Sequence, residues 1–209
     1  IDLPRNYDLE SIFVKVSGVV NITTLYGGTA RVEGPLQLIK RIDVQAEGRT
    51  TLESLPMAIA RNGNFQRRGL APVTNFTAGA VAAYTIKASC YLDRAMLDGI
   101  RPKDSNFRTG NLNVFQLKLT LGAVADCFTG AAGVANVTGL TVEVAVVELD
   151  EQVDENNQMT RPLVVMKRYS ADLALPAANA NQQIILPVGN YMRGIILRGT
   201  ISGEPSDLV

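Results

Sequence analysis

Apolar and polar residues alternate along most of this chain. Between residues 9 and 23 the apolar side chains recur at every second position, apart from a break at Gly18, and they are Ile12, Val14, Val16, Val20 and Ile22. Successive side chains of a β-strand point to opposite faces, so this spacing predicts a long strand with one buried face. The same alternation predicts further strands over residues 36–46, 49–52, 84–92, 115–121 and 142–146.

Two more strands are predicted beyond residue 160, over residues 163–169 and 183–201. The second is interrupted at Pro187, because proline cannot donate a hydrogen bond to a strand ladder. Helix signals are weaker. Residues 54–63 begin with a capping serine and close with a glycine, and residues 93–99 are long enough for one or two turns. We expect both segments to be short connectors that lie over a sheet.

Long strands joined by loops, without alternating helices, favour an all-β fold, and specifically an antiparallel jelly-roll sandwich. The stretch 148–159 is rich in acids and amides and marks a predicted domain boundary. Residues 1–150 would form a first jelly-roll β-barrel, and residues 151–209 a second β-barrel or its partial remainder. The whole would be a double jelly roll, two jelly rolls in tandem, with the second short or incomplete. Small residues at 129–138 and 174–180 indicate exposed loops.

The composition of the chain argues against several classes of function. The chain has 209 residues, 46% of them hydrophobic, and its 20 basic and 20 acidic side chains cancel to a net charge of zero. It contains no histidine, which excludes a Ser-His-Asp or Cys-His hydrolase. No basic block is present, whereas nucleic-acid binding needs clustered Lys and Arg. We therefore predict no enzyme, no catalytic residue, no cofactor, no small-molecule substrate and no specific nucleic-acid partner.

No apolar run reaches the roughly eighteen residues of a membrane-spanning helix, and residues 1–5 lack the order of charges and apolar residues of a signal peptide. We expect a protein that does not cross a membrane. The sequence begins with Ile1 rather than methionine and ends on the apolar pair Leu208 and Val209. This suggests a chain trimmed from a longer one.

Carboxylates gather just after the strand predicted at 142–146. They are Glu148, Asp150, Glu151, Asp154 and Glu155. Calcium takes about six to eight oxygen ligands, so it is the one metal that such a cluster suggests. The spacing lacks the glycine of an EF-hand loop, and a run of charges is ordinarily a solvated loop. No metal-ligating residue is assigned.

Three arginines share a short polar segment with one aromatic residue. They are Arg61, Arg67 and Arg68, and the aromatic residue is Phe65. A phosphate or a lipid headgroup is one conceivable ligand for such a loop. A subunit contact or a solvated loop is the simpler interpretation, because three arginines create only a modest electrostatic field.

The two cysteines, Cys90 and Cys127, are predicted to be buried free thiols, although one disulfide stays open as an alternative. Neither has a histidine that could activate it, so no role is assigned to them. Paired carboxylates for glycoside hydrolysis depend on a cleft geometry that a linear sequence does not show. The absence of tryptophan removes the usual side chain for stacking on sugars.

Three segments, LPRNYDLESI at residues 3–12, LIKRIDVQAEG at residues 38–48 and ILPVGNYMRGI at residues 185–195, carry a family resemblance. They resemble coat proteins of tailless, membrane-containing icosahedral bacteriophages, of the corticovirus and finnlakevirus type. The resemblance implies two jelly rolls in one chain that stand upright on the capsid, with three chains in a pseudo-hexagonal capsomer. At 209 residues, this chain is short for two such barrels.

The resemblance implies a structural role as the major capsid protein of a virion, forming trimeric capsomers that tile an icosahedral shell. Its partners would be itself, as a homotrimer, and neighbouring capsomers, with minor capsid or membrane proteins as further ones. The protein would be made in the host cytoplasm and reside in the capsid. Two other interpretations stay open: a phage tail, baseplate or spike component, and a β-sandwich carbohydrate-binding module.

Overall fold

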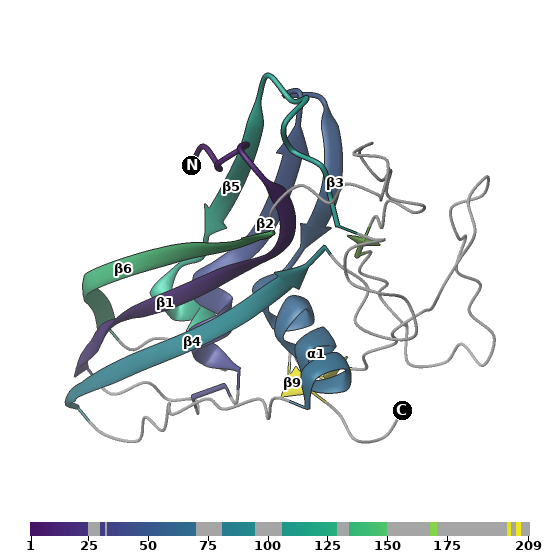
Figure 1. Cartoon of the computed structure of the whole chain (residues 1–209). Coiled ribbons are helices and arrows are strands. Elements are labelled where there is room, and N and C mark those ends of the chain that lie inside the picture. Colours follow the sequence, from purple (N-terminus) through teal and green to yellow (C-terminus); the bar gives the residue numbers. More distant parts are fainter. Residues whose placement is uncertain are drawn as a thin grey trace, which may run out of the picture.

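The computed structural model describes residues 1–24, 30–31, 33–69, 81–94, 106–128, 134–149, 168–170, 200–201 and 204–205. Strands dominate this part of the chain (Figure 1). In chain order the elements are β1 (Asp8–Thr24), the 3-10 helix η1 (Gly34–Leu38), β2 (Ile39–Ala46), β3 (Thr50–Leu55), α1 (Met57–Arg68), β4 (Ala83–Asp93), β5 (Phe115–Leu121), the 3-10 helix η2 (Val124–Cys127), β6 (Val134–Leu149), β7 (Arg168–Tyr169), β8 (Thr200–Ile201) and β9 (Glu204–Pro205). The predicted all-β class is confirmed.

Two sheets form the body of the molecule (Figure 1). One has the strand order β4–β1–β6, and both of its strand pairs are antiparallel. The other has the order β5–β2–β3–β7, antiparallel except for the short parallel pair of β3 with β7. Strands β8 and β9 form a separate two-stranded pair. Among the described strands, the long strand β1 therefore lies at the centre of the first sheet, with β4 and β6 on its two sides.

The core lies between the two sheets, as the alternation of β1 predicts. Ile12, Val14 and Val16 of β1 are fully buried, in one cluster with Ile42 of β2 and Leu117 of β5. Burial of each such side chain stabilises the fold by about 1.5–3 kcal/mol. A second cluster at the far end of β1 includes Val20, Leu38, Ile86, Cys127 and Phe128. The strands thus bury their predicted apolar faces.

Helix α1 differs from the helix predicted at 54–63, because it begins at Met57 and continues to Arg68. Pro56 stands just before its first residue, where a missing backbone N–H costs little. Gly63 does not end the helix, since the buried residues Ala60 and Asn64 pack it against the rest of the fold. The arginine segment is therefore helical rather than a loop.

Strand β6 is much longer than the strand predicted at 142–146. Residues 134–138, predicted as part of a loop, extend the ladder, and Ala135 and Val137 pair with Ile22 and Val20 of β1. Small residues with little side-chain bulk suggested a loop, but the long partner β1 provides a template for pairing. The predicted strand at 36–46 likewise begins with the 3-10 helix η1.

The proposed second domain, residues 151–209, lies mostly outside the described residues. Within it the structure describes β7, Ser170, β8 and β9, and β7 pairs with β3 of the four-stranded sheet. The division at residue 150 stays a prediction. The predicted helical turn at 95–99 and the loop at 174–180 also fall outside the described part. No helix among the described residues has the length and apolar sequence needed to cross a membrane.

Candidate assembly surface and buried ionic cluster

Exposed apolar side chains are concentrated on a few elements. Among the described residues, the large hydrophobic side chains that stay exposed are Ile1, Tyr7, Val81, Val114, Leu121, Leu140 and Val147. Leu140 and Val147 belong to β6, and Leu121 belongs to β5, which is an edge strand of the other sheet. Figure 1 shows β5, β6 and the N-terminus on the same side of the molecule, away from α1. This side is the candidate surface for contact with a partner.

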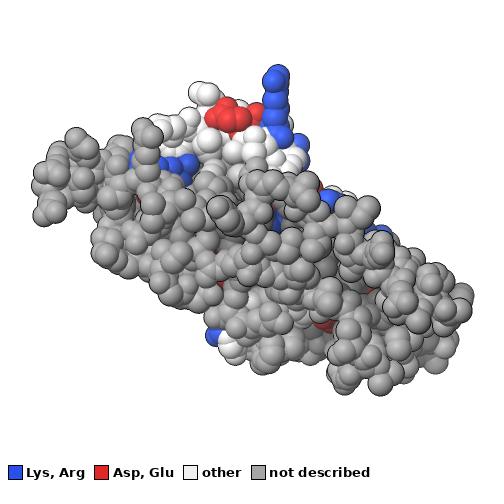
Figure 2. All heavy atoms as spheres, turned by 90° about the vertical axis from the view of Figure 1, so that its right-hand side faces the viewer, with Lys and Arg blue, Asp and Glu red and all other residues white. Residues whose placement is uncertain are grey.

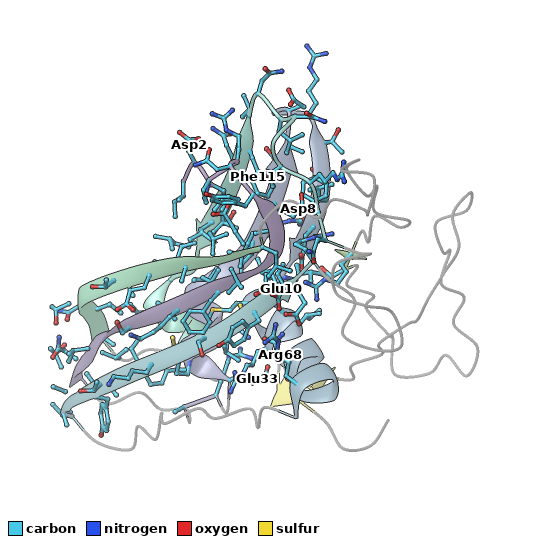
Figure 3. The ribbon with its side chains drawn as sticks, viewed as in Figure 1. Asp2, Asp8, Glu10, Glu33, Arg68 and Phe115 are labelled. Carbon is cyan, nitrogen blue, oxygen red and sulfur yellow. The ribbon has the colours of Figure 1, made fainter. Side chains whose placement is uncertain are left out.

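The N-terminal residues cover part of the free edge of β5. The Ile1 amino group donates to the Leu117 carbonyl at 3.0 Å, and the Leu117 N–H donates back to the Ile1 carbonyl at 2.9 Å. The Leu3 N–H donates to the Phe115 carbonyl at 2.9 Å, and the Leu3 side chain is buried. Asp2, labelled beside Phe115 in Figure 3, accepts a hydrogen bond from the Gln116 amide at 2.9 Å. Residues 1–3 therefore act as one more antiparallel strand.

Helix α1 covers the outer side of β4 at one residue, Tyr91, by means of one buried side chain. Asn64 donates from Nδ2 to the Tyr91 carbonyl at 2.9 Å, and its Oδ1 accepts from the Tyr91 N–H at 2.6 Å. Both backbone groups of Tyr91 are thus satisfied as they would be by a neighbouring strand. Protein sheets that leave such groups unpaired at an edge offer a template for unwanted strand pairing.

The opposite edge of this sheet, formed by β6, has no such cover among the described residues. We call the side of β6 that faces away from β1 the β6 edge. Within the described part of the chain, backbone hydrogen bonds reach β6 from β1 alone. The sequence of β6, VANVTGLTVEVAVVEL, contains no Lys, Arg or Pro, the residues that usually protect an edge.

A bulge divides β6 into two parts. Gly18 of β1 lies opposite both Gly139 and Leu140, and Gly139 has a φ of 59°, a left-handed conformation that glycine adopts at low cost. A Cβ on Gly18 would lie 3.3 Å from the Leu140 Cα, so glycine also allows the close approach here. Beyond the bulge, residues 141–147 pair with β1 in one register, and a second register shift falls between Val147 and Glu148.

The two faces of this stretch differ in polarity. Val142, Val144 and Val146 point toward the core but are only partly buried. On the outer face Glu143 forms an exposed ion pair with Lys15 of β1 at 2.8 Å. An edge strand with valines that the fold covers only partly is the arrangement expected where a further element packs.

A cluster of buried charges lies at the other side of the molecule. Glu53 of β3 is fully buried and pairs through Oε2 with Arg94 Nη1 at 3.0 Å, and through Oε1 with Arg168 Nη2 at 2.5 Å. Arg168 also donates to the Asp93 carbonyl at 3.3 Å. One carboxylate thus joins β3 to the end of β4 and to β7. A buried carboxylate needs such partners, since an unpaired one is very costly.

Arg68, one of the three arginines noted in the sequence, extends this cluster. Its guanidinium pairs with the buried carboxylate of Asp93, and the hydrogen bond to Asp93 raises the pKa of Arg68. The same guanidinium lies 4.3 Å from the centre of the Tyr91 ring, between α1 and β4 (Figure 3). Arg61 lies in the same helix, and the side chain of Arg67 is outside the described part. Arg68 therefore has an internal structural role rather than a place in a ligand-binding loop.

The described residues visible in Figure 2 include both Lys or Arg atoms and Asp or Glu atoms, and neither kind forms a large patch among them. That view shows the right-hand side of Figure 1, and the described Lys and Arg atoms there stand near Asp and Glu atoms. A hollow of about 260 Å³ lies between the N-terminal residues and β5, lined by Asp2, Leu3, Arg5 and residues 113–116. Arg5 spans it and donates to the backbone carbonyls of Leu112 and Asn113. Its lining holds no paired carboxylates and no cysteine.

Both cysteines are buried and free, as predicted. Burial raises the pKa of the Cys90 thiol and of the Cys127 thiol to about 12 in each case. A thiolate is the reactive form of cysteine, so these side chains are chemically inert in the folded protein. They contribute packing to the core.

The calcium prediction is not tested by the structure. Glu148 lies in β6, while Asp150 and the three acidic residues after it lie outside the described residues. Within the described ranges, no group of three or more Cys, Asp or Glu side chains is arranged to hold a metal ion.

Comparison with known proteins finds similarity in structure only. No family model and no curated protein sequence matches this chain. The "Crystal Structure of the STIV MCP" matches with a TM-score of 0.50 and 14% identity, over 77% of this chain and 48% of that one. A chain in the atomic structure of Sulfolobus Turreted Icosahedral Virus matches with a TM-score of 0.55 and 15% identity, over 77% of this chain and 45% of that one.

This chain has the fold of a viral major capsid protein. The predicted jelly-roll architecture is thereby confirmed for the all-β body. The chain spans about half the length of the solved chains that it matches. The matched virus is one of Sulfolobus, so the bacteriophage group suggested by the sequence stays a prediction.

Proposed function

We propose that this protein is a structural component of a virion, a major capsid protein whose activity is assembly. The observation that carries the proposal is the jelly-roll fold that it shares with a viral major capsid protein. A fold alone does not define a function, so the exposed residues must be considered as well. The concentration of exposed apolar side chains near β5 and β6 is what an assembling subunit requires.

On this proposal, three chains form a capsomer with a pseudo-hexagonal outline, and capsomers tile an icosahedral shell. The virus would be a tailless, membrane-containing bacteriophage of the kind that the sequence resembles. Residues 1–150 would form the first jelly roll, and residues 151–209 a second β-barrel or its partial remainder. Minor capsid or membrane proteins would be further partners, and the chain, made in the host cytoplasm, would catalyse no reaction.

Light scattering of the purified 209-residue chain, followed by negative-stain microscopy of the same sample, tests this proposal. We expect the mass of a stable trimer and particles with a roughly hexagonal outline, or closed shells. A compact monomer at every concentration would contradict the capsid role. An elongated or ring-shaped oligomer would point to a tail, baseplate or spike component, and a monomer that binds glycans would point to a carbohydrate-binding module.

A further inference from the structure

Strand β7 meets the outer side of β3 over only two residue pairs, in parallel orientation. So short a ladder provides few backbone hydrogen bonds, and parallel pairing is slightly less stable per residue than antiparallel pairing. Ser170, directly after β7, adds two hydrogen bonds of 3.3 Å, from its N–H and from its hydroxyl to the Ser54 carbonyl. Strand pairing by itself is therefore a weak attachment for residues 168–170.

Arg168 supplies the charged contact of this segment. Its Nη2 lies 2.5 Å from Glu53 Oε1 and 3.3 Å from the carbonyl oxygen of Asp93. The Glu53 side chain has no exposed surface and the Arg168 side chain is 14% exposed, so solvent screens this ion pair little. Hydrogen bonds between charged groups are roughly twice as strong as those between neutral groups. One guanidinium group thus joins β7 both to β3 and to the end of β4.

Each buried carboxylate of this cluster also has an arginine partner other than Arg168. Glu53 pairs through Oε2 with Arg94 at 3.0 Å, and the carboxylate of Asp93 pairs with Arg68. Strand β3 has its own antiparallel ladder with β2. If Arg168 moved into water, both carboxylates would keep an arginine, and the large cost of a buried charge without a partner would not arise.

We propose that Arg168 is a latch. It fastens residues 168–170 to β3 through the buried carboxylate of Glu53, and it opens by local unfolding that leaves the two large sheets intact. These residues are the described part of the stretch 151–209 that pairs with the four-stranded sheet, so Arg168 is the positioning residue that fixes where this stretch joins the body. The inference concerns how the chain is held together and does not depend on the capsid role.

Two substitutions at one position test the latch. Arg168→Met removes the charge but keeps a long, unbranched side chain, whereas Arg168→Lys keeps the positive charge on such a side chain. Arg5→Met is the matched control, because Arg5 is an exposed arginine whose guanidinium donates to backbone carbonyls. Residue-resolved hydrogen exchange of the full chain compares the Ser170 amide with the amides at the buried centre of β1. Circular dichroism establishes which variants fold.

In the wild type, we expect the Ser170 amide to be less protected than the β1 amides, because local opening requires less free energy than global unfolding. Arg168→Met should speed exchange of the Ser170 amide at least about tenfold, since the loss of a hydrogen bond between charged groups exceeds the free energy that this factor represents. The β1 amides of this variant should remain protected. Arg168→Lys should retain most of the protection at Ser170, and Arg5→Met should retain all of it.

Equal protection of Ser170 and β1 in the wild type would overturn the inference, because β7 would then leave β3 only when the whole body unfolds. A chain with Arg168→Met that does not fold would overturn it for the same reason. Equal exchange at Ser170 in Arg168→Met and Arg168→Lys would show that the charge does not hold the segment. Unchanged exchange at Ser170 in Arg168→Met would remove the latch altogether.

Discussion

Individual side chains supply the partners that allow this fold to bury charged groups. Glu53 stands in β3 with no exposed surface, and the guanidinium groups of Arg94 and Arg168 supply its countercharges. The three partners are far apart in the sequence, so their spacing carries no signal that would predict the cluster. What joins them is the packing of β3, β4 and β7 in one place.

Replacing Glu53 with glutamine should destabilise the protein strongly. The change keeps the shape of the side chain but removes the negative charge that two buried guanidinium groups pair with, and breaking a buried pair in this way costs about 3–5 kcal/mol. Urea unfolding of Glu53→Gln measures the loss. The control is Glu143→Gln, which breaks the exposed ion pair with Lys15 and should cost about 1 kcal/mol or less. Equal effects of the two substitutions would contradict the structural role of the buried cluster.

At the scale of elements, the two outer described strands of the β4–β1–β6 sheet differ in their contacts with the rest of the chain. Helix α1 lies against β4 and presents Asn64 to the Tyr91 backbone, so this residue of the outer strand is satisfied inside the subunit. Strand β6 has no corresponding contact among the described residues.

Asn64→Ala should destabilise the protein by about 2 kcal/mol, because it leaves the Tyr91 N–H and carbonyl without their partner at a partly buried site. The loss is measured by urea unfolding and by faster hydrogen exchange of the Tyr91 amide. Asn62→Ala is the matched control, since Asn62 lies in the same helix and makes a single 3.4 Å hydrogen bond to Glu33. Unchanged exchange at Tyr91 in Asn64→Ala would show that Asn64 does not close the edge.

At the scale of the whole molecule, the chain has zero net charge, and the exposed large apolar side chains among its described residues lie mainly near β5 and β6. The β6 edge has two charged side chains, and one of them is already paired with Lys15. Long-range electrostatics therefore contribute little to any contact made there. Burial of apolar surface and strand pairing would provide the free energy of association.

Assembly should accordingly be insensitive to salt. Raising the salt from about 0.1 M to 1 M shortens the Debye length from about 10 Å to 3 Å and would weaken a contact made by ion pairs. We expect light scattering to give the same oligomer mass at both concentrations. Dissociation at the higher salt would show that charged groups, rather than buried apolar surface, hold the subunits together.

Much of the fold could be predicted from alternation, and the failures have physical causes. The period of two in β1, β4 and β5 identified these strands because each buries one face. The same signal failed at residues 134–138, where small residues suggested a loop although β1 extends far enough to pair with them. It also failed for α1, because Gly63 suggested an end that tertiary packing against β4 overrides.

The candidate surface was harder to predict than the fold. The composition correctly indicated buried, free thiols at Cys90 and Cys127. The arginine segment was interpreted as a loop, whereas Arg68 is an internal partner of Asp93. Nothing in the sequence of β6 distinguishes an edge strand from a central one, since both alternate in the same way. The absence of Lys and Pro from VANVTGLTVEVAVVEL was the one available hint.

The sequence by itself determined the class of this protein, its strand faces and its lack of histidine chemistry. These follow from local spacing and composition, which are properties of neighbouring residues. Only the tertiary structure decided the strand order, the burial of Glu53 and the contact of Asn64 with the Tyr91 backbone. Each of these joins residues that are distant in the chain, and pairing between distant strands is set by the packing of the whole fold rather than by any local pattern.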